Sequence, residues 1–281
     1  MALIEDTFIS HLVELRDRLM RALIAIAVAF AVVGFWPTYS VIYDFLALPL
    51  IQTLPAGSKM IATGVITPFL IPLKVGLMAA FMLVLPYVLY QAWAFVAPGL
   101  YSHEKKLVLP LVISSTVLFL MGVAFCYYFV FGQLFRFIAG FAPASITPAP
   151  DIEQYLSFVL TMFLAFGVAF EVPVAIIVLV RMGVVTVPQL REYRGYFVVG
   201  ASIAAAVVTP PDVVSMLALL IPMCLLYEAG IIAASFISRV KAPQDKSDSA
   251  AEATEVKPPL TSEQVAAEFA AVEKEQNSGG R

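Results

Sequence analysis

Residues 157–181 have the sequence SFVLTMFLAFGVAFEVPVAIIVLVR and are apolar almost throughout. A run of this length exceeds the roughly 20 residues that an α-helix needs to cross a bilayer. Glu171 lies well inside the run, and Pro173 follows two positions later. A carboxylate at that depth costs roughly 3 kcal/mol or more, so such residues usually face a protein interior or a wet cavity. We therefore expect either a hydrogen bond that locks two helices together or a surface where Glu171 meets another group.

The whole chain has the composition of an integral membrane protein. Of its 281 residues, 61% are hydrophobic and 13% are charged, far from the values of a soluble domain. Both cysteines, Cys126 and Cys224, lie inside apolar runs, whereas His11 and His103 lie outside them. This placement indicates neither a disulfide nor a metal framework, and we expect no cofactor.

Six membrane spans are expected, joined by loops with proline, glycine or charge. They cover about residues 20–36, 71–96, 107–131 and 157–181, then a fifth span before Asp212 and a sixth between Asp212 and Glu228. The last two would measure about 26 Å and 23 Å at 1.5 Å per residue. Because a hydrocarbon core is roughly 30 Å thick, both fit poorly unless the bilayer thins locally.

Three parts of the chain differ in composition. Residues 1–19 contain an amphipathic segment that we expect to lie along the membrane surface before the chain turns inward. Residues 20–237 form the six-span domain. Residues 238–281 form an acidic tail expected to be mostly disordered, in which residues 261–276 have the pattern of one weak helix.

The basic residues predict which side of the membrane the loops face. Leaving the tail aside, eight Lys or Arg residues fall on the side of the N-terminus and three on the other. The eight are Arg16, Arg18, Arg21, Lys105, Lys106, Arg181, Arg191 and Arg194, and the three are Lys59, Lys74 and Arg136. Positive residues favour the cytoplasmic side, so we expect both termini in the cytoplasm.

Common catalytic patterns are missing from the sequence. It has no phosphate-binding GxxxxGK[ST] and no HExxH zinc motif. A short stretch, residues 200–203 (GASI), weakly resembles an intramembrane serine protease, but neither histidine lies in a span to activate Ser202. We expect a protein that binds or conducts, and not an enzyme.

Two acidic residues, Glu14 and Glu104, lie beside the first and second spans at the predicted cytoplasmic surface. Local ion pairing, such as Glu14 with Arg18 four residues later, is one interpretation, and such pairs contribute only tenths of a kcal/mol. The other interpretation is a site for a cationic guest. Spacing alone leaves both open.

Four motifs decide between them. The sequences HLVELRDRL, FVAPGLYSHEKK, FGVAFEVPV and VVTPPDV occur in this order along six expected spans. This pattern, over about residues 5–237, resembles the TatC family, the receptor subunits of the twin-arginine protein translocase. The resemblance implies a cupped bundle of six helices in the bacterial cytoplasmic (inner) membrane. It also implies export of folded proteins driven by the proton-motive force.

The resemblance further implies roles for individual residues. The patch that binds a twin-arginine signal peptide corresponds to Glu14 and Glu104, supported by Arg16, Arg18, Pro98, Leu100 and Tyr101. Contacts with a partner helix correspond to Glu171, Ser202 and Ala205, and a structural turn corresponds to Asp212, which can cap the final helix. Implied partners are twin-arginine signal peptides, the single-span proteins TatA and TatB, further copies of the chain and the lipid bilayer, but no nucleic acid.

A second hypothesis of another class is a proton-coupled secondary transporter that uses Glu171 as its coupling site. The chain shows no internal repeat, so one direct sign of such a transporter is missing.

Overall fold

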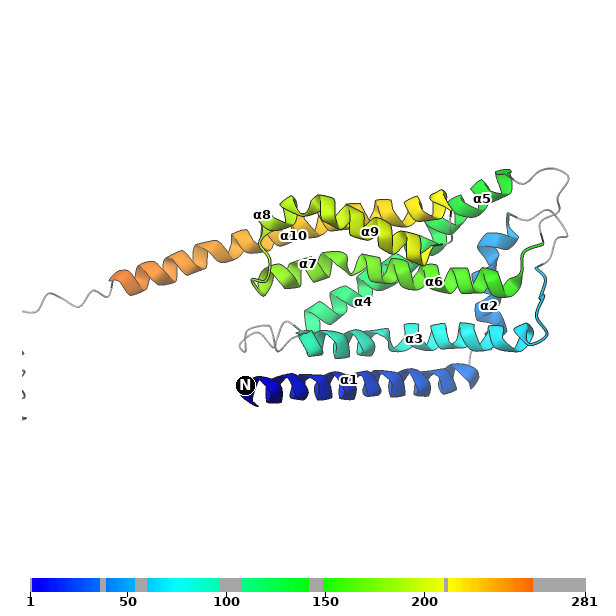
Figure 1. Cartoon of the computed structure of the whole chain (residues 1–281), viewed down its shortest axis with the longest axis horizontal. Coiled ribbons are helices and arrows are strands. Elements are labelled where there is room, and N and C mark those ends of the chain that lie inside the picture. The colour runs from blue at the N-terminus through cyan, green and yellow to red at the C-terminus, as the bar shows by residue number, and fades with distance from the viewer. Residues whose placement is uncertain are drawn as a thin grey trace, which may run out of the picture. The chain divides into compact units, whose positions relative to one another are not determined.

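The computed structural model describes residues 2–35, 39–53, 60–96, 108–141, 149–209 and 212–254 (Figure 1). Within these ranges the regular elements are helices, and one isolated bridge joins Ile61 to Asp151. The chain divides into two units, Met1–Ser235 and Phe236–Arg281. The first unit holds the apolar helices and is described below.

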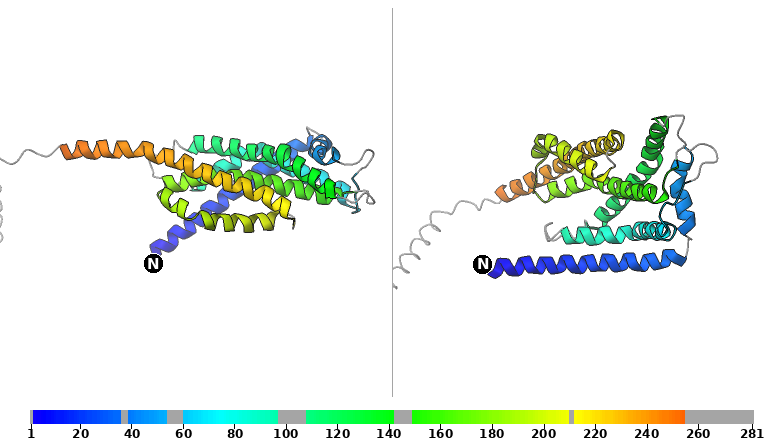
Figure 2. Two further views of the ribbon diagram at one scale, coloured as in Figure 1. Left: turned by 90° about the horizontal axis from the view of Figure 1, so that it is seen from above. Right: turned by 45° about the vertical axis from the view of Figure 1, so that its right-hand side comes forward.

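Helix α1 (Ala2–Phe35) is continuous over 34 residues, about 51 Å at 1.5 Å per residue. The expected turn between a surface segment at residues 1–19 and a separate first span does not occur. The reason is visible in the sequence, because no glycine or proline interrupts the helix before Gly34. Helix α1 packs against α3 (Thr67–Val96), beside which it lies in Figure 1 and in the right-hand view of Figure 2.

Four helical stretches among the described residues are long and apolar enough to cross a membrane. They are Thr67–Val96, Val108–Gly140, Ile152–Arg181 and Val213–Phe236. The second comprises α4 (Val108–Phe125), a π-helical turn η3 (Cys126–Val130) and α5 (Phe131–Phe141), so helix replaces the start of the loop expected from residue 134. The third comprises α6 (Ile152–Phe170) and α7 (Val172–Arg181), interrupted at Glu171.

The last two membrane helices differ in length. Helix α9 (Arg194–Val208) has 15 residues, about 22 Å of helix, and is as short as expected. Helix α10 (Val213–Thr254) continues through Glu228, and its apolar part reaches Phe236, so the expectation of a short sixth span is wrong. Glu228 does not end the helix, and its carboxylate is paired with Arg194 of α9, with Nη2 2.6 Å from Oε2. Residues 242–254 continue α10, residues 261–276 lie outside the described part, and the expected disorder of the tail stays a prediction.

The core of this unit is rich in phenylalanine and lies between α4, η3, α5 and α6. Phe131 and Phe166 are fully buried within it. Two glycines allow α4 and α6 to approach closely. A Cβ at Gly122 would collide with the backbone of Phe166, and one at Gly167 would collide with the Phe119 ring. Each helix thus packs a phenylalanine against a glycine of the other.

Helix α2 (Tyr39–Ile51) is held to this core by two tyrosine hydroxyls. Pro49 has no N–H, so it cannot donate to the carbonyl of Phe45 four residues earlier. The Tyr127 hydroxyl donates to that carbonyl at 2.8 Å, and the Tyr155 hydroxyl donates to the next one, Leu46 O, at 2.8 Å. Pro49 therefore leaves Phe45 O without its helical donor, and Tyr127 of η3 supplies a donor from outside α2.

We expect the substitution Tyr127→Phe to lower the free energy of unfolding by about 1 kcal/mol, the contribution of one hydrogen bond. In a Pro49→Ala background, residue 49 can donate to Phe45 O, so the same substitution should cost much less. A double-mutant cycle in detergent micelles measures the difference. Tyr128→Phe is the control, because Tyr128 is 72% exposed on the same turn. Equal costs of Tyr127→Phe in the two backgrounds would contradict the role of Pro49.

Candidate functional site

A polar cavity of about 370 Å³ lies on the first half of α1. Its lining side chains come from one face of the helix: Ser10, Val13, Glu14, Asp17, Arg18 and Arg21. Four of these six are charged, and we call this surface the α1 charged patch. It has room for a polar guest beside a carboxylate.

Glu14 is ion-paired within α1. Arg18 donates to Glu14 Oε1 twice, from Nη2 at 2.6 Å and from Nε at 3.0 Å. The Glu14 side chain is 35% exposed, and its second oxygen, Oε2, lies 3.9 Å from His11 Nδ1. Arg16 pairs with its neighbour Asp17 at 2.9 Å. Local pairing of Glu14 is therefore present, but it occupies one carboxylate oxygen and leaves the other without a close partner among the described residues.

The α1 charged patch is fixed to α3 by an aromatic stack. The His11 ring lies on the Phe95 ring with centroids 4.3 Å apart. Phe95 is the second-last residue of α3, directly before the segment that carries Pro98, Leu100, Tyr101 and Glu104. Those four predicted site residues lie outside the described part of the chain. The structure thus describes Glu14, Arg16 and Arg18 of the predicted peptide site.

Glu171 occupies the break between α6 and α7. Its backbone N–H bonds Val168 O at 3.0 Å, and Pro173 is the second residue of α7, in the first turn, where a missing N–H is tolerated. Both carboxyl oxygens are buried without a well-formed hydrogen bond to the described residues. The Ser115 hydroxyl of α4 lies beside the carboxyl, outside good hydrogen-bond geometry. Since buried polar groups normally have hydrogen-bond partners, the Glu171 carboxyl is available to bond another group.

The predicted partner contacts on α9 divide into two kinds. Ala205 is fully buried and packs in the core of this chain, and its contact with a partner helix stays a prediction. Ser202 is partly buried and its hydroxyl donates to Val198 O of its own helix at 2.8 Å. Gly200 and Ala204 lie one turn apart on the exposed face, with open space around Gly200. The exposed small residues on α9 are therefore Gly200 and Ala204, which lie next to the predicted contact residues Ser202 and Ala205.

Asp212 caps the helix that follows it. Its Oδ1 accepts a hydrogen bond of 2.7 Å from the backbone N–H of Ser215, three residues later. This is the N-cap arrangement, which satisfies one of the free donors at a helix start. The geometry supports a structural role for Asp212.

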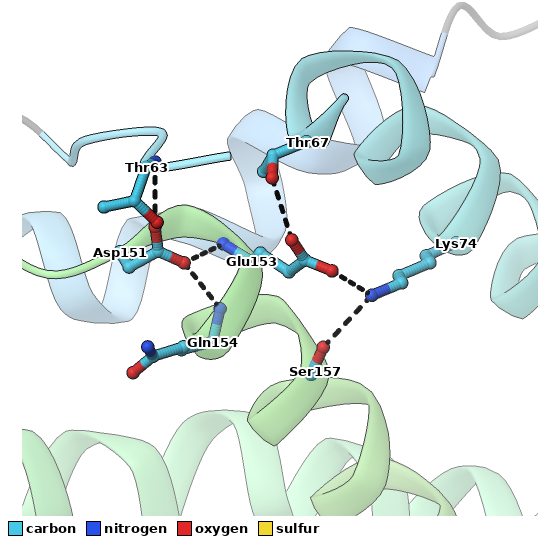
Figure 3. A network of polar contacts seen from close by, with 7 residues as sticks. All are labelled: Thr63, Thr67, Lys74, Asp151, Glu153, Gln154 and Ser157. Carbon is cyan, nitrogen blue, oxygen red and sulfur yellow. Dashed lines mark hydrogen bonds and ion pairs between the residues drawn. The ribbon is translucent and has the colours of Figure 1, made fainter. Parts of the chain in front are cut away.

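A polar network that the sequence analysis missed joins the start of α3 to the start of α6 (Figure 3). Glu153 accepts from Thr67 Oγ1 at 2.8 Å and from Lys74 Nζ at 2.9 Å, and Lys74 also reaches Ser157 Oγ at 3.4 Å. The partners are 79 or more positions apart, so spacing does not reveal them. The available signal was Lys74 itself, an ionisable residue inside an apolar run.

Asp151 joins the same network and caps α6. Its Oδ1 accepts from the backbone N–H groups of Glu153 and Gln154, and its Oδ2 accepts from the hydroxyl and N–H of Thr63. These bonds, the Thr63 hydroxyl first, lower the pKa of Asp151 to about 2. Alongside, the backbone N–H of Ile61 donates to Pro150 O at 3.1 Å, and that of Ile152 donates to Ile61 O at 2.9 Å. The network therefore fastens the segment before α3 onto the start of α6.

These features define an all-helical integral membrane protein with one charged patch at a helix end and one open carboxyl at a helix break. A family model described as TatC, Sec-independent protein translocase protein, matches residues 10–222. The chain belongs to the TatC family, a family of protein translocase subunits. This confirms the resemblance found in the four sequence motifs.

Relatives and solved structures agree with this assignment. The chain is 49% identical over 228 residues to the Sec-independent protein translocase protein TatC of Haemophilus influenzae, covering 81% of this chain and 88% of that protein. It is 47% identical to TatC of Escherichia coli K12, covering 83% and 90%. Against TatC of Halothiobacillus neapolitanus the identity is 48%, but the match spans 63% of that longer protein. A crystal structure of the twin-arginine translocase receptor TatC superposes with a TM-score of 0.72 at 35% identity, covering 81% of this chain and 99% of that one.

We expect Asp151 to contribute stability that depends on pH. Its pKa lies below the ordinary aspartate value of 3.8, so its contribution is complete above about pH 4 and is lost as the pH falls towards 2. The melting temperature of the wild type in a mild detergent should exceed that of Asp151→Asn at pH 6. The difference should shrink towards zero near pH 2. A difference that stays constant from pH 6 to pH 2 would show that the carboxylate charge is not responsible.

Proposed function

We propose that this chain is the receptor subunit of a twin-arginine protein translocase, and that it binds the paired arginines of signal peptides on folded cargo proteins. Family membership supports this, as does the receptor described in the solved structure that the chain resembles. It works without catalytic chemistry of its own. Its partners would be the single-span proteins TatA and TatB and further copies of this chain, and the proton-motive force would drive transport.

The observation that carries the proposal is the carboxylate of Glu14 in the α1 charged patch. Arg18 holds Oε1, while Oε2 has only His11 at 3.9 Å in a cavity of about 370 Å³. A guest guanidinium could therefore bind Oε2 without breaking the internal pair. Arg18 keeps the carboxylate in one orientation, and a pre-oriented acceptor loses less side-chain entropy on binding.

The chemistry explains a preference for arginine over lysine. A guanidinium presents several donors in a rigid planar fork, whereas an ammonium is a single charge that is strongly hydrated. Glu104 lies in the segment that follows Phe95, and Phe95 stacks on His11 of the patch. We propose that Glu14 and Glu104 each bind one arginine, supported by Arg16, Arg18, Pro98, Leu100 and Tyr101. Two acids on separate segments would account for a requirement for two consecutive arginines.

Partner helices would meet two features of the membrane domain. Glu171 offers a buried carboxyl whose oxygens lack well-formed bonds within the described residues. On α9, Gly200 and Ala204 lie four residues apart on an exposed face, the spacing that lets transmembrane helices approach closely. We propose that a single-span partner packs against this face beside Ser202, while Asp212 keeps its structural role.

In the membrane we propose six spans in a cupped bundle in the bacterial cytoplasmic membrane, with both termini inside. The four long apolar stretches supply most of these spans, and α1 and α9 would supply the others. The same arrangement keeps the six-span domain at residues 20–237 and the acidic tail at 238–281 as separate functional parts. The excess of basic residues on one side supports this orientation. The relatives are translocase proteins, which favours this function over a proton-coupled transporter.

We expect Glu14→Gln to weaken binding of a twin-arginine signal peptide by about 10-fold to 100-fold. The reason is the loss of a charge-assisted hydrogen bond, roughly 1.5–3 kcal/mol. Fluorescence anisotropy of a labelled peptide on the full chain in nanodiscs measures the affinity, and Glu104→Gln should behave similarly. Glu192→Gln removes the same charge from exposed helix α8 (Val187–Glu192) and serves as the control. Wild-type affinity in both the Glu14 and Glu104 variants would remove the recognition proposal.

The orientation has its own test. In a variant whose native cysteines are replaced by alanine, we introduce Val65→Cys or Arg191→Cys, two exposed positions on opposite sides of the proposed membrane. A membrane-impermeant maleimide should label intact cells at position 65, and should label position 191 only after the cells are opened. The reverse pattern would invert the proposed topology.

A further inference from the structure

The packing of α4 against α6 places Ser115 opposite Glu171. Phe119 of α4 lies against Gly167 of α6, and Gly122 lies against Phe166 and Phe170. Ring contacts further along, Phe125 with Phe166, Phe131 with Phe163 and Phe135 with Phe158, show that the α4–α5 stretch and α6 run in opposite directions. One turn before Phe119 is Ser115, and one turn after Gly167 is Glu171, so these two side chains meet at the same level. The closeness of the Ser115 hydroxyl to the Glu171 carboxyl agrees with this register.

Ser115 receives a hydrogen bond from a third helix. Trp93 of α3 donates from Nε1 to Ser115 Oγ at 2.8 Å. An indole N–H is a donor only, so Ser115 Oγ must be the acceptor and its own hydrogen points elsewhere. Ser115 is fully buried, which keeps bulk water from that hydrogen. Because Ser115 Oγ accepts from Trp93, the Ser115 hydroxyl hydrogen is left to donate to another group.

The neighbouring hydroxyls on α4 behave differently. Ser114 donates to Leu111 O at 2.9 Å and Thr116 donates to Val112 O at 2.8 Å, both carbonyls of their own helix. The bond that the structure shows at Ser115 Oγ is the one from Trp93. A buried donor without an acceptor and a buried carboxyl without a donor therefore lie side by side.

We infer that Ser115 is a positioning residue for Glu171: oriented by Trp93, its hydroxyl donates to the Glu171 carboxyl and holds it at the helix break between partner contacts. A small side-chain rotation closes the bond, and it converts two unsatisfied groups into a satisfied pair. When a partner helix approaches, its polar residue takes the place of Ser115 as the hydrogen-bond donor to Glu171. The carboxyl is therefore hydrogen-bonded both before and after the partner binds. The hydrogen bond stands without the proposed translocase function, while its importance for export rests on that function.

Difference infrared spectroscopy of the full chain in nanodiscs tests the bond. Subtracting the spectrum of Glu171→Gln identifies the Glu171 band, in the carbonyl region when the group is neutral and in the carboxylate region when it is ionised. Loss of a donor moves a carbonyl stretch to higher wavenumber. We expect Ser115→Ala and Trp93→Phe to shift the Glu171 band and Ser115→Thr, which keeps the hydroxyl, to restore it.

Ser114→Ala is the matched control, since it removes a hydroxyl from the next residue of the same helix and should leave the band in place. A Glu171 band that is unchanged in Ser115→Ala, or shifted equally by Ser114→Ala, overturns the inferred bond. Should Trp93→Phe fail to fold, the comparison of Ser115→Ala with Ser114→Ala decides alone. Export of a twin-arginine reporter protein is measured on the same variants. We expect a several-fold loss for Ser115→Ala and recovery for Ser115→Thr. A shifted band with normal export would keep the bond and overturn its role in transport.

Discussion

The constraint on which this structure depends is that a backbone carbonyl or N–H in lipid must find its partner inside the protein. Several departures from regular helix in the apolar unit are matched by such a partner. Pro49 removes a donor from α2, and the Tyr127 hydroxyl replaces it at Phe45 O. Asp151 and Asp212 satisfy the free N–H groups where α6 and α10 begin. The breaks are therefore tolerated because side chains from distant elements complete them.

Among the described charged side chains, some form closed pairs, whereas Glu14 and Glu171 have carboxyl oxygens without a close partner. Arg194 with Glu228 and Lys74 with Glu153 are closed pairs that tie helices together. Glu14 is closed on one oxygen only, and Glu171 has no strong internal partner among the described residues. An unfilled carboxylate is costly in a protein interior, so its retention indicates a group that is satisfied by something else. The two acids that the chain leaves open are also two that the family resemblance marks for a guest and a partner helix.

The sequence predicted most of what is local and little of what joins distant segments. Apolar runs of sufficient length predicted the membrane helices, and the stretch around Asp212 predicted its cap. The absence of glycine and proline before Gly34 was a readable sign that α1 is continuous, and it was overlooked. The pairing of Glu228 with Arg194 was not readable, because the two residues are 34 positions apart. The burial of Ala205 likewise depends on how α9 packs, which composition cannot reveal.

Helix α3 links the two open acids physically. Phe95 stacks on His11 beside Glu14, and Trp93, two residues earlier, bonds Ser115 beside Glu171. Residues two apart on a helix point to nearly opposite sides, so one turn of α3 contacts α1 with one aromatic ring and α4 with the other. A helix is rigid over this distance, so the patch on α1 and the carboxyl at the α6–α7 break are held at a fixed separation. Under the proposed function, a peptide whose arginines bind at the patch would lie at a defined distance from a partner helix at Glu171.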